Sequence, residues 1–276
     1  MDKDFPGEKD MVKGRERARM ALWGAVCGDV IGSAYEWHPV KDYDFKLLRR
    51  SSRFTDDTVC SVAVAEAIAC GKPFAQALRE WCRRYPRAGY GGRFRRWIMF
   101  EDAGPYGSWG NGSAMRVSAI GAWAESAEEA LRLAKESSEV THDHPEGVKG
   151  AQAVALAIHL ALAGHGKEQI RDEIERRFGY DLGRSYASIQ PGYSFDVSCR
   201  GSVPESIICF LESHDYESAV RLAVAMGGDA DTMAAIAGGI AAPYYGEIPE
   251  EILDGCMKRL GTDLREAVER FNALLV

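Results

Sequence analysis

The chain has 276 residues, with 34 lysines and arginines against 41 aspartates and glutamates, and so a formal net charge of −7. This acidic balance argues against a general nucleic-acid-binding protein, because such a protein needs a positive field to attract phosphate. Hydrophobic residues make up 46% of the chain and charged residues 27%, which excludes extended disorder and is typical of a globular protein with a sizeable core.

Residues 1–14 are charged and lack the apolar stretch of a signal peptide, so we expect a flexible extension ahead of a single domain at 15–276. The most apolar stretch, 233–245, is shorter than the roughly 20 residues of a membrane span. The seven cysteines are scattered and form no C-x-x-C pair, which favours buried thiols over disulfides or zinc. We therefore predict a cytoplasmic protein that does not contact membranes and, as the simplest expectation, a monomer.

The pattern along the chain is helical. Buried helices are predicted where alanine is frequent and charge is rare, at 61–70, 148–162 and 231–242. Amphipathic helices are predicted at 15–27, 74–85, 127–140, 167–178, 216–226, 250–260 and 263–275, and an apolar helix at 113–124. Ser126, Asp215 and Thr262 precede three of these as cap residues. The best strand candidate is 194–197, so the fold class is all-α.

Two of the buried helices begin with paired carboxylates beside threonines. N-capping needs one acid for each helix, whereas carboxylate and hydroxyl oxygens together are the ligands of Mg²⁺ or Mn²⁺. Four aspartates with Glu36 could hold two such ions. The pattern alone leaves capping and metal binding open as interpretations. The residues are Thr55, Asp56, Asp57 and Thr58 at one helix start, and Asp229, Asp231 and Thr232 at the other.

The glycines at 24, 28 and 32 are four residues apart and predict a flat helix face for close packing. Asp29 stands beside them and could support a metal site without binding the metal itself. A glycine-rich loop at 104–112 could present backbone N–H groups to phosphate, although a simple connector is the commoner use of such a loop. It is not G-x-G-x-x-G and no strand precedes it, which excludes a Rossmann nucleotide site.

His142 lies where a buried helix begins, and there we favour ligand contact or a structural role. The H-x-H spacing of His142 and His144 does not match a helical zinc site. Arginines alternate with aromatic residues between 83 and 97, a pattern that can bind phosphate and stack on bases. A solvated face around a glycine turn is the alternative, and the acidic chain favours it.

Taken in order, five segments resemble the ADP-ribosylglycohydrolase family, typified by dinitrogenase reductase-activating glycohydrolase and the ADP-ribosyl-acceptor hydrolases. They are G-x-x-x-G-D-x-x-G-x-x-x-E at 24–36, F-T-D-D-T at 54–58, G-N-G-S-A-M-R at 110–116, T-H at 141–142 and G-G-D-A-D-T at 227–232. S-V-P-E at 202–205 also matches, and the resemblance runs from about residue 17 to residue 246.

The resemblance implies a compact, orthogonal all-α bundle around two Mg²⁺ ions, and hydrolysis of the glycosidic bond between ADP-ribose and an acceptor. The metal ligands that it implies are Thr55, Asp56, Asp57, Asp229, Asp231 and Thr232. Asp56 or Asp57 would position or deprotonate water, with Glu36 as the rival. Contacts to the diphosphate and riboses would come from Glu36, Gly107, Ser108, Trp109, Gly110, Asn111, Gly112, Met115 and His142.

Several alternatives stay open at this point. Some family members carry a carboxylate just before the glycine loop; Glu101 and Asp102 are near that place, but three residues intervene and neither is assigned a role. The acceptor could be an arginine or serine side chain, a nucleic-acid end, or a small molecule such as O-acetyl-ADP-ribose. The alternative functions are a non-catalytic, ADP-ribose-binding or crystallin-like structural member of the family, and a nucleic-acid-directed protein that uses 83–97.

Overall fold

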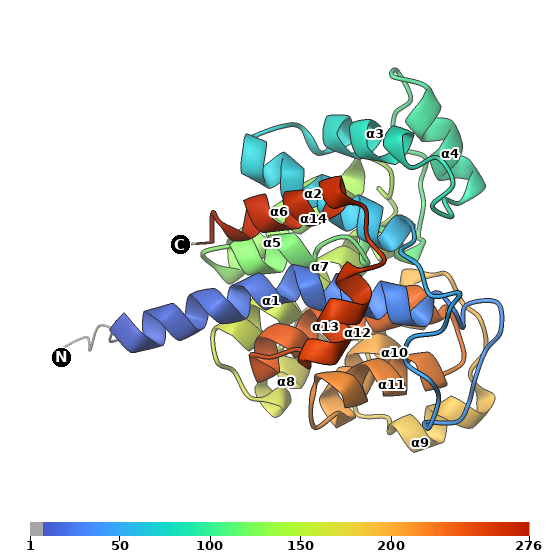
Figure 1. Ribbon diagram of the computed structural model, residues 1–276, viewed down its shortest axis with the longest axis vertical. Helices are drawn as coiled ribbons and strands as arrows, with labels where there is room; N and C mark the ends of the chain where they lie inside the picture. Colours follow the sequence, from blue (N-terminus) through green and yellow to red (C-terminus); the bar gives the residue numbers. More distant parts are fainter. Residues whose placement is uncertain (1–7, 276) are drawn as a thin grey trace.

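The computed structural model describes residues 8–275, which form helices joined by loops (Figure 1). Within this range there is no strand, only one isolated antiparallel bridge between Gly110 and Ser198, so the predicted all-α class is confirmed. The α-helices are α1 (Glu8–Gly32), α2 (Asp56–Cys70), α3 (Phe74–Arg84), α4 (Gly92–Met99), α5 (Ser118–Trp123), α6 (Ala127–Glu139), α7 (Pro145–Leu162), α8 (Lys167–Phe178), α9 (Tyr186–Ile189), α10 (Cys199–Glu212), α11 (Tyr216–Ala225), α12 (Ala230–Tyr245), α13 (Glu250–Met257) and α14 (Thr262–Asn272), with the 3₁₀ helices η1 (Asn111–Ser113) and η2 (Gln190–Gly192).

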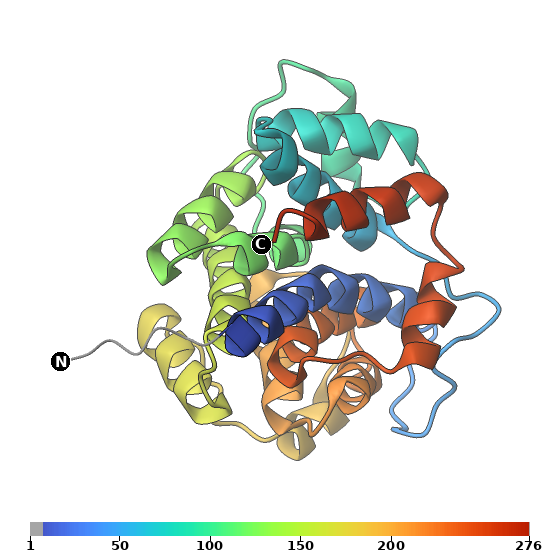
Figure 2. The same cartoon turned by 60° about the vertical axis from the view of Figure 1, so that its left-hand side comes forward.

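Helices α1 and α12 run side by side through the middle of the molecule (Figure 2). Their backbones are so close that a Cβ added at Gly28 would lie 2.1 Å from the carbonyl oxygen of Ala234. A Cβ added at Gly24 or Gly32 would lie 2.3 Å from a carbonyl oxygen of α12. The predicted flat face of glycines is therefore confirmed, and only glycine fits at these contacts.

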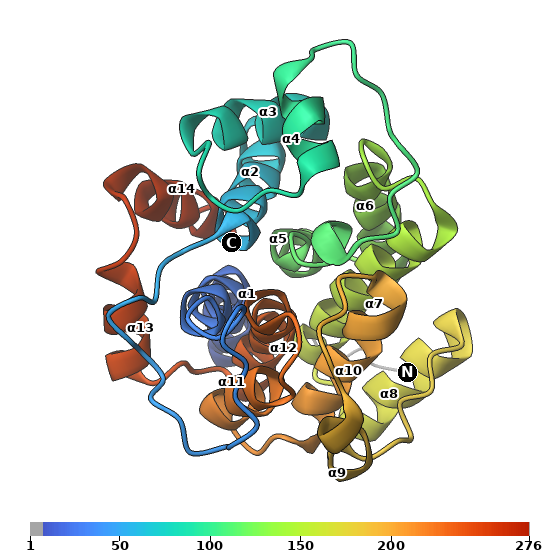
Figure 3. The same ribbon diagram turned by 90° about the vertical axis from the view of Figure 1, so that its right-hand side faces the viewer.

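The other helices pack around this pair in two groups. Helices α2, α5 and α14 lie on one side, with α3 and α4 outside α2, while α10 and α11 lie on the other side (Figures 1 and 3). Helix α7 contacts α5, α10 and α12, and α6 and α8 pack against it. Val26, Val62 and Ile240 are among the fully buried side chains of a single continuous core. Burial of this apolar surface is the main stabilising contribution to the arrangement.

The three predicted buried helices are confirmed as parts of α2, α7 and α12. The amphipathic predictions correspond to α1, α3, α6, α8, α11, α13 and α14. Helix α1 begins at Glu8, so residues 8–14 of the expected extension are helical, and residues 1–7 lie outside the described residues. The predicted helix at 113–124 is wrong in its first half, because η1 and a turn precede α5.

The predicted strand at 194–197 is wrong, since this segment is irregular and ends in the single bridge at Ser198. Helices α4, α9 and α10 are absent from the sequence prediction. Pro204 lies inside α10 and removes a backbone donor, which is typical of helix ends rather than interiors. Helix α4 was not predicted because arginines separate the few apolar positions that face the core.

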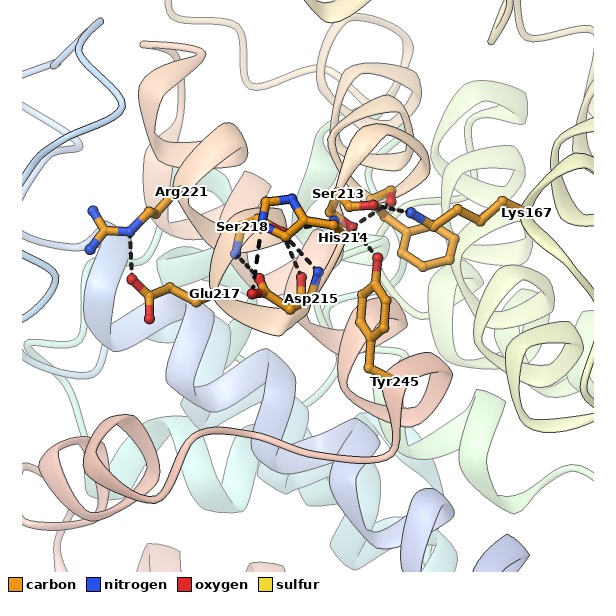
Figure 4. Close-up of polar contacts among 9 residues, drawn as sticks. Lys167, Ser213, His214, Asp215, Glu217, Ser218, Arg221 and Tyr245 are labelled. Carbon is orange, nitrogen blue, oxygen red and sulfur yellow. Dashed lines mark hydrogen bonds and ion pairs between the residues drawn. The ribbon is translucent and has the colours of Figure 1, made fainter.

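Two of the three predicted caps are confirmed. Ser126 accepts a hydrogen bond from the N–H of Glu129 at the start of α6. Asp215 accepts one from the N–H of Ser218, at 2.7 Å, at the start of α11 (Figure 4). Thr262 is instead the first residue of α14, after Gly261 at the cap position, so the third prediction is wrong. A side-chain cap contributes about 1 kcal/mol, enough to fix where these helices begin.

Within residues 8–275 no helix is both long and apolar enough to cross a membrane. The seven cysteines are all free thiols, and every one except Cys70 is buried. This agrees with the prediction of cysteines as small core residues.

A candidate metal centre and substrate cavity

The carboxylates predicted from the sequence come from segments that meet at one end of the central helix pair, on the side that faces the viewer in Figure 3. Helix α1 ends there, and α2 and α12 begin there. The close packing of α1 on α12 brings Asp29, in the last turn of α1, beside Asp57 and Asp231. The glycine face of α1 therefore determines the position of the site.

Asp29 is fully buried and accepts four hydrogen bonds from the residues at the start of α2. The N–H groups of Thr55 and Thr58 donate to it over 2.9 and 3.1 Å, and the Thr55 hydroxyl donates over 2.7 Å. The Thr58 hydroxyl is the fourth donor. These bonds hold the start of α2, and with it Asp56 and Asp57, against α1.

Two overlapping groups of carboxylates form the centre. Oxygen atoms of Asp29, Asp57 and Asp231 all lie within 4.8 Å of one another. The same is true of Glu36, Asp229 and Asp231, so Asp231 belongs to both groups. Carboxylates this close repel one another unless protons or cations neutralise them.

Helix capping does not account for these acids. The hydroxyl of Thr55 caps α2 by accepting from the N–H of Asp57, 3.3 Å away. Asp229 stands at the cap position of α12 but makes no side-chain cap bond there. Its carboxylate accepts instead from the side-chain amide of Asn111, at 2.8 Å. The geometry therefore favours a ligand site over the capping interpretation.

One oxygen of Asp57 has no partner among the described residues. Its Oδ2 lies 3.4 Å from the hydroxyl of Thr55 and 3.3 Å from that of Thr232. Its Oδ1 is buried and accepts no hydrogen bond. An unsatisfied buried acceptor costs roughly 1–3 kcal/mol. A carboxylate between two hydroxyl groups, with a free oxygen, matches the donors that a hard cation prefers.

Burial raises the pKa of the carboxyl groups in the cluster. The pKa of Glu36 rises to about 7, through burial and the nearby charge of Asp231. Burial and the same charge raise the pKa of Asp56 to about 8. The pKa of Asp229 rises to about 6, mainly through burial, and the pKa values of Asp57 and Asp231 are also raised by burial. Shifts of this kind gather at functional sites.

The glycine loop is part of the site rather than a plain connector. The N–H of Asn111 donates to the carbonyl of Val197 over 2.8 Å, and the N–H of Cys199 donates to the carbonyl of Trp109 over 2.9 Å. The loop is thereby attached to the segment before α10. Because the side chain of Asn111 also reaches Asp229, the loop and the carboxylates form one unit.

His142 lies buried beneath this loop. Its Nδ1 is 2.7 Å from the hydroxyl of Thr141, to which Arg116 donates over 3.1 Å. Its other ring nitrogen, Nε2, faces the glycine loop, since a Cβ added at Gly112 would lie 3.2 Å from that atom. Burial and the charge of Arg116 lower the pKa of His142 well below its usual value, so the ring is neutral. Sequence reasoning gave Arg116 no role, and its place in a matching motif was the only signal.

The contacts of His142 and His144 do not indicate a zinc site. His144 caps α7 by accepting from the N–H of Glu146 over 3.1 Å. Across the part of the chain that the structure describes, neither candidate metal cluster includes a histidine.

A cavity of about 440 Å³ joins the carboxylates to the glycine loop, a size typical of small-molecule sites. Gly107 and Trp109, which were predicted to contact the substrate, do not line it. The N–H of Gly107 donates to Asp143, and Trp109 packs edge-on against His144 with 53% of its surface exposed. The predicted residues that do line it are Glu36, Asp56, Asp57, Ser108, Gly110, Asn111, Gly112, Met115, His142, Asp229, Asp231 and Thr232.

The further residues that line the cavity include Trp37, Phe195 and Arg93, none of which the sequence analysis named as a substrate contact. Trp37 and Phe195 stack on one another with ring centroids 5.4 Å apart, and Arg93 reaches the cavity from α4. Trp37 directly follows Glu36, and that neighbour was the only signal for it. Phe195 lies in the segment mistaken for a strand.

Three of the aromatic residues between 83 and 97 are part of the packed core rather than of an exposed surface. Tyr90, Phe94 and Trp97 are buried, and Phe94 stacks on Trp97 at a centroid distance of 5.5 Å. Arg83 donates to a backbone carbonyl and pairs with Glu101, which lies outside the carboxylate cluster. The burial of these rings speaks against base stacking by Tyr90 and Trp97, whereas Arg93 and Phe94 line the cavity.

Comparison with known proteins decides the family. The family model described as ADP-ribosylglycohydrolase matches residues 11–275. The chain belongs to this family. The resemblance seen in the ordered motifs is confirmed, and the match extends beyond them at both ends.

Similar proteins have related descriptions. ADP-ribosylhydrolase ARH3 of Homo sapiens is 28% identical, over 90% of this chain and 91% of that protein. ADP-ribosylarginine hydrolase Tri1 of Pseudomonas putida is 28% identical, over 84% of this chain and 71% of that protein. A solved structure described as an ADP-ribosylglycohydrolase-related protein complex shares the fold, with a TM-score of 0.73 at 24% identity over 96% of this chain and 98% of that one. Membership in the family and the two similar hydrolases support an ADP-ribosyl hydrolase.

Proposed function

We propose that the protein hydrolyses the glycosidic bond between ADP-ribose and an acceptor, with two Mg²⁺ ions bound to its carboxylate cluster. The observation that carries this proposal is the convergence of carboxylates from three segments on a cavity that also contains the glycine loop. A family named for this reaction supports it. Mn²⁺, another hard divalent cation, suits the same oxygen donors.

The donor set fits two hard cations. Asp231 belongs to both groups of carboxylates, and the unpartnered Oδ1 of Asp57 is a ready ligand atom. When bound, the ions supply positive charge that orients ribose hydroxyls and lowers the pKa of a water molecule. The residues that would hold them are Thr55, Asp56, Asp57, Asp229, Asp231 and Thr232.

We propose Glu36 for proton transfer. It is half-buried at the edge of the cluster and lines the cavity, and without bound cations burial and the charge of Asp231 raise its pKa to about 7. Its carboxylate takes a proton from the attacking water, and its protonated form donates to the leaving acceptor. Asp57, which the sequence favoured together with Asp56, suits metal binding better, because it lies between the hydroxyls of Thr55 and Thr232.

The loop residues that line the cavity, Ser108 and 110–112, are assigned with His142 to the diphosphate and riboses. The neutral ring of His142 presents Nε2 toward Gly110 and Gly112, and Arg93 adds positive charge at the cavity edge. Binding energy from the diphosphate, remote from the reacting carbon, helps to hold the ribose in place. The positive charge that develops at the anomeric carbon is stabilised by the surrounding carboxylates.

The test is the release of free ADP-ribose from substrates modified on arginine, on serine, on a nucleic-acid end or on acetate, each with Mg²⁺ and with EDTA. We expect release from at least one acceptor class, abolished by EDTA. Release that continues in EDTA would contradict the metal assignment. ADP-ribose binding without release from any substrate would support the alternative of a non-catalytic family member.

A further inference from the structure

A second hollow of about 500 Å³ lies next to the cavity of the proposed active site. It is lined by α4 and by the segment that follows it, up to Tyr106. Arg93 and Tyr106 line both spaces, so the hollow begins where the cavity ends. A substrate that fills the cavity could therefore continue into the hollow. Figure 1 shows α4 at the outer edge of the molecule, where such an extension would be free to leave.

The charge of this hollow differs from that of the chain. Arg93 and Arg96 are exposed on α4, and no described carboxylate pairs with either of them. Their neighbour Arg83, by contrast, is engaged with Glu101 and a backbone carbonyl. Two free guanidinium groups in a protein with a net charge of −7 favour an anion, and their planar N–H donors match the oxygens of phosphate.

The rest of the lining fits a nucleoside. Phe100 follows α4 with 54% of its surface exposed, and Tyr106 is half-buried between the two spaces. An exposed aromatic ring provides a face on which a base stacks. The carboxylate of Asp102 repels phosphate, but it accepts hydrogen bonds from ribose hydroxyls or a base amine. Phosphate and nucleoside contacts thus occur together in one hollow.

We propose that this hollow is a subsite for a phosphate-bearing nucleotide unit attached to the ADP-ribose, so that the protein prefers substrates in which a nucleotide chain continues beyond it. This inference rests on the proposed function. It requires no stacking by the buried aromatics of α4; the contacts come from Arg93, Arg96 and Phe100. Such a unit could belong to a further ADP-ribose or to a nucleic-acid strand.

The test compares two arginines of the same helix. Arg96 lines only the hollow, whereas Arg95 is exposed on α4 and lines neither space, so Arg95→Gln is the matched control for Arg96→Gln. The substrates are a peptide with a single ADP-ribose, the same peptide with a short chain of ADP-ribose units, and an oligonucleotide with an ADP-ribosylated terminal phosphate. The measured quantity is kcat/KM, at low and at moderate ionic strength.

We expect Arg96→Gln to lower kcat/KM roughly tenfold on a substrate with the extra unit, because a charge-assisted contact is lost. The single-unit substrate should change by less than about twofold. A loss confined to the ADP-ribose chain or to the oligonucleotide identifies the source of the unit. Equal effects of Arg96→Gln and Arg95→Gln would overturn the subsite. An equal loss on the single-unit substrate would also overturn it, by assigning the hollow to the ADP-ribose itself.

Binding measurements separate the subsite from the proposed function. Calorimetric titration with ADP-ribose and with an ADP-ribose dimer needs no turnover. We expect the dimer to bind more tightly, and Arg96→Gln to remove this difference while Arg95→Gln keeps it. Equal affinity of the unaltered protein for both ligands would contradict the subsite even if hydrolysis is observed. A dimer preference without hydrolysis would retain the subsite and reject the enzyme.

Discussion

The buried carboxylate cluster predicts that stability falls as the pH rises when no cation is bound. Asp229 is buried, and its pKa rises from 3.8 to about 6. The folded protein therefore retains a proton that the unfolded chain releases between about pH 4 and pH 6, and the stabilisation that is complete below pH 4 is lost across that range. At about 1.4 kcal/mol for each pKa unit, the loss is about 3 kcal/mol. With roughly 2 °C for each kcal/mol in a chain of this size, Tm falls by about 6 °C.

Mg²⁺ is expected to reverse this trend, because cations bind the ionised carboxylates and compete with protons. At a concentration a hundredfold above its Kd, an ion adds about 2.7 kcal/mol. The stabilisation by Mg²⁺ should therefore be larger at about pH 7.5 than at about pH 5. Thermal unfolding in EDTA and in Mg²⁺, from about pH 4 to about pH 7.5, measures both effects.

The matched variants decide whether the cluster causes the effect. Asp229→Asn keeps the shape of the side chain but cannot ionise, so it should flatten the profile in EDTA by about 3 kcal/mol and weaken the response to Mg²⁺. Asp254→Asn removes the same charge from the exposed face of α13 and should behave like the unaltered protein. If the two variants give the same profiles, the reasoning from burial is wrong.

Three further predictions concern catalysis and packing. Asp57→Asn should lower kcat by more than about a hundredfold, since even a supporting partner of a metal ligand contributes about ten- to a hundredfold. Circular dichroism checks that the variant is folded, and a folded variant with full activity would reject the ligand assignment. Glu36→Gln should lower kcat, because an amide cannot take up and release the proton, and an unchanged kcat would exclude Glu36 from proton transfer. Gly28→Ala should lower the free energy of unfolding by at least about 1–3 kcal/mol, because its Cβ would lie 2.1 Å from the carbonyl oxygen of Ala234. The control is Gly92→Ala, which has open space around its Cβ and should change this free energy by less than about 0.5 kcal/mol. Chemical denaturation measures both variants.

The sequence by itself determined the features of this protein that depend on neighbouring residues. Glycines at 24, 28 and 32 fall on one helix face, so their spacing alone predicts a close helix contact, which α1 and α12 make. Alanine-rich stretches with little charge likewise predict buried helices, because residues close together in the sequence form each helix. The acids and threonines at 55–57 and 229–232 stand out because each group occupies a single helix start, and the order of these motifs along the chain identified the family.

Only the tertiary structure decided how these groups meet and which residues join them. Asp57 and Asp229 lie far apart in the chain and share one site because α2 and α12 both begin beside the end of α1. Packing also brought Arg93 and Phe195 into the cavity and buried Tyr90 and its aromatic neighbours. Burial and carboxylate repulsion depend on contacts between distant segments, which no local pattern records, so the raised pKa values of the cluster follow from the fold.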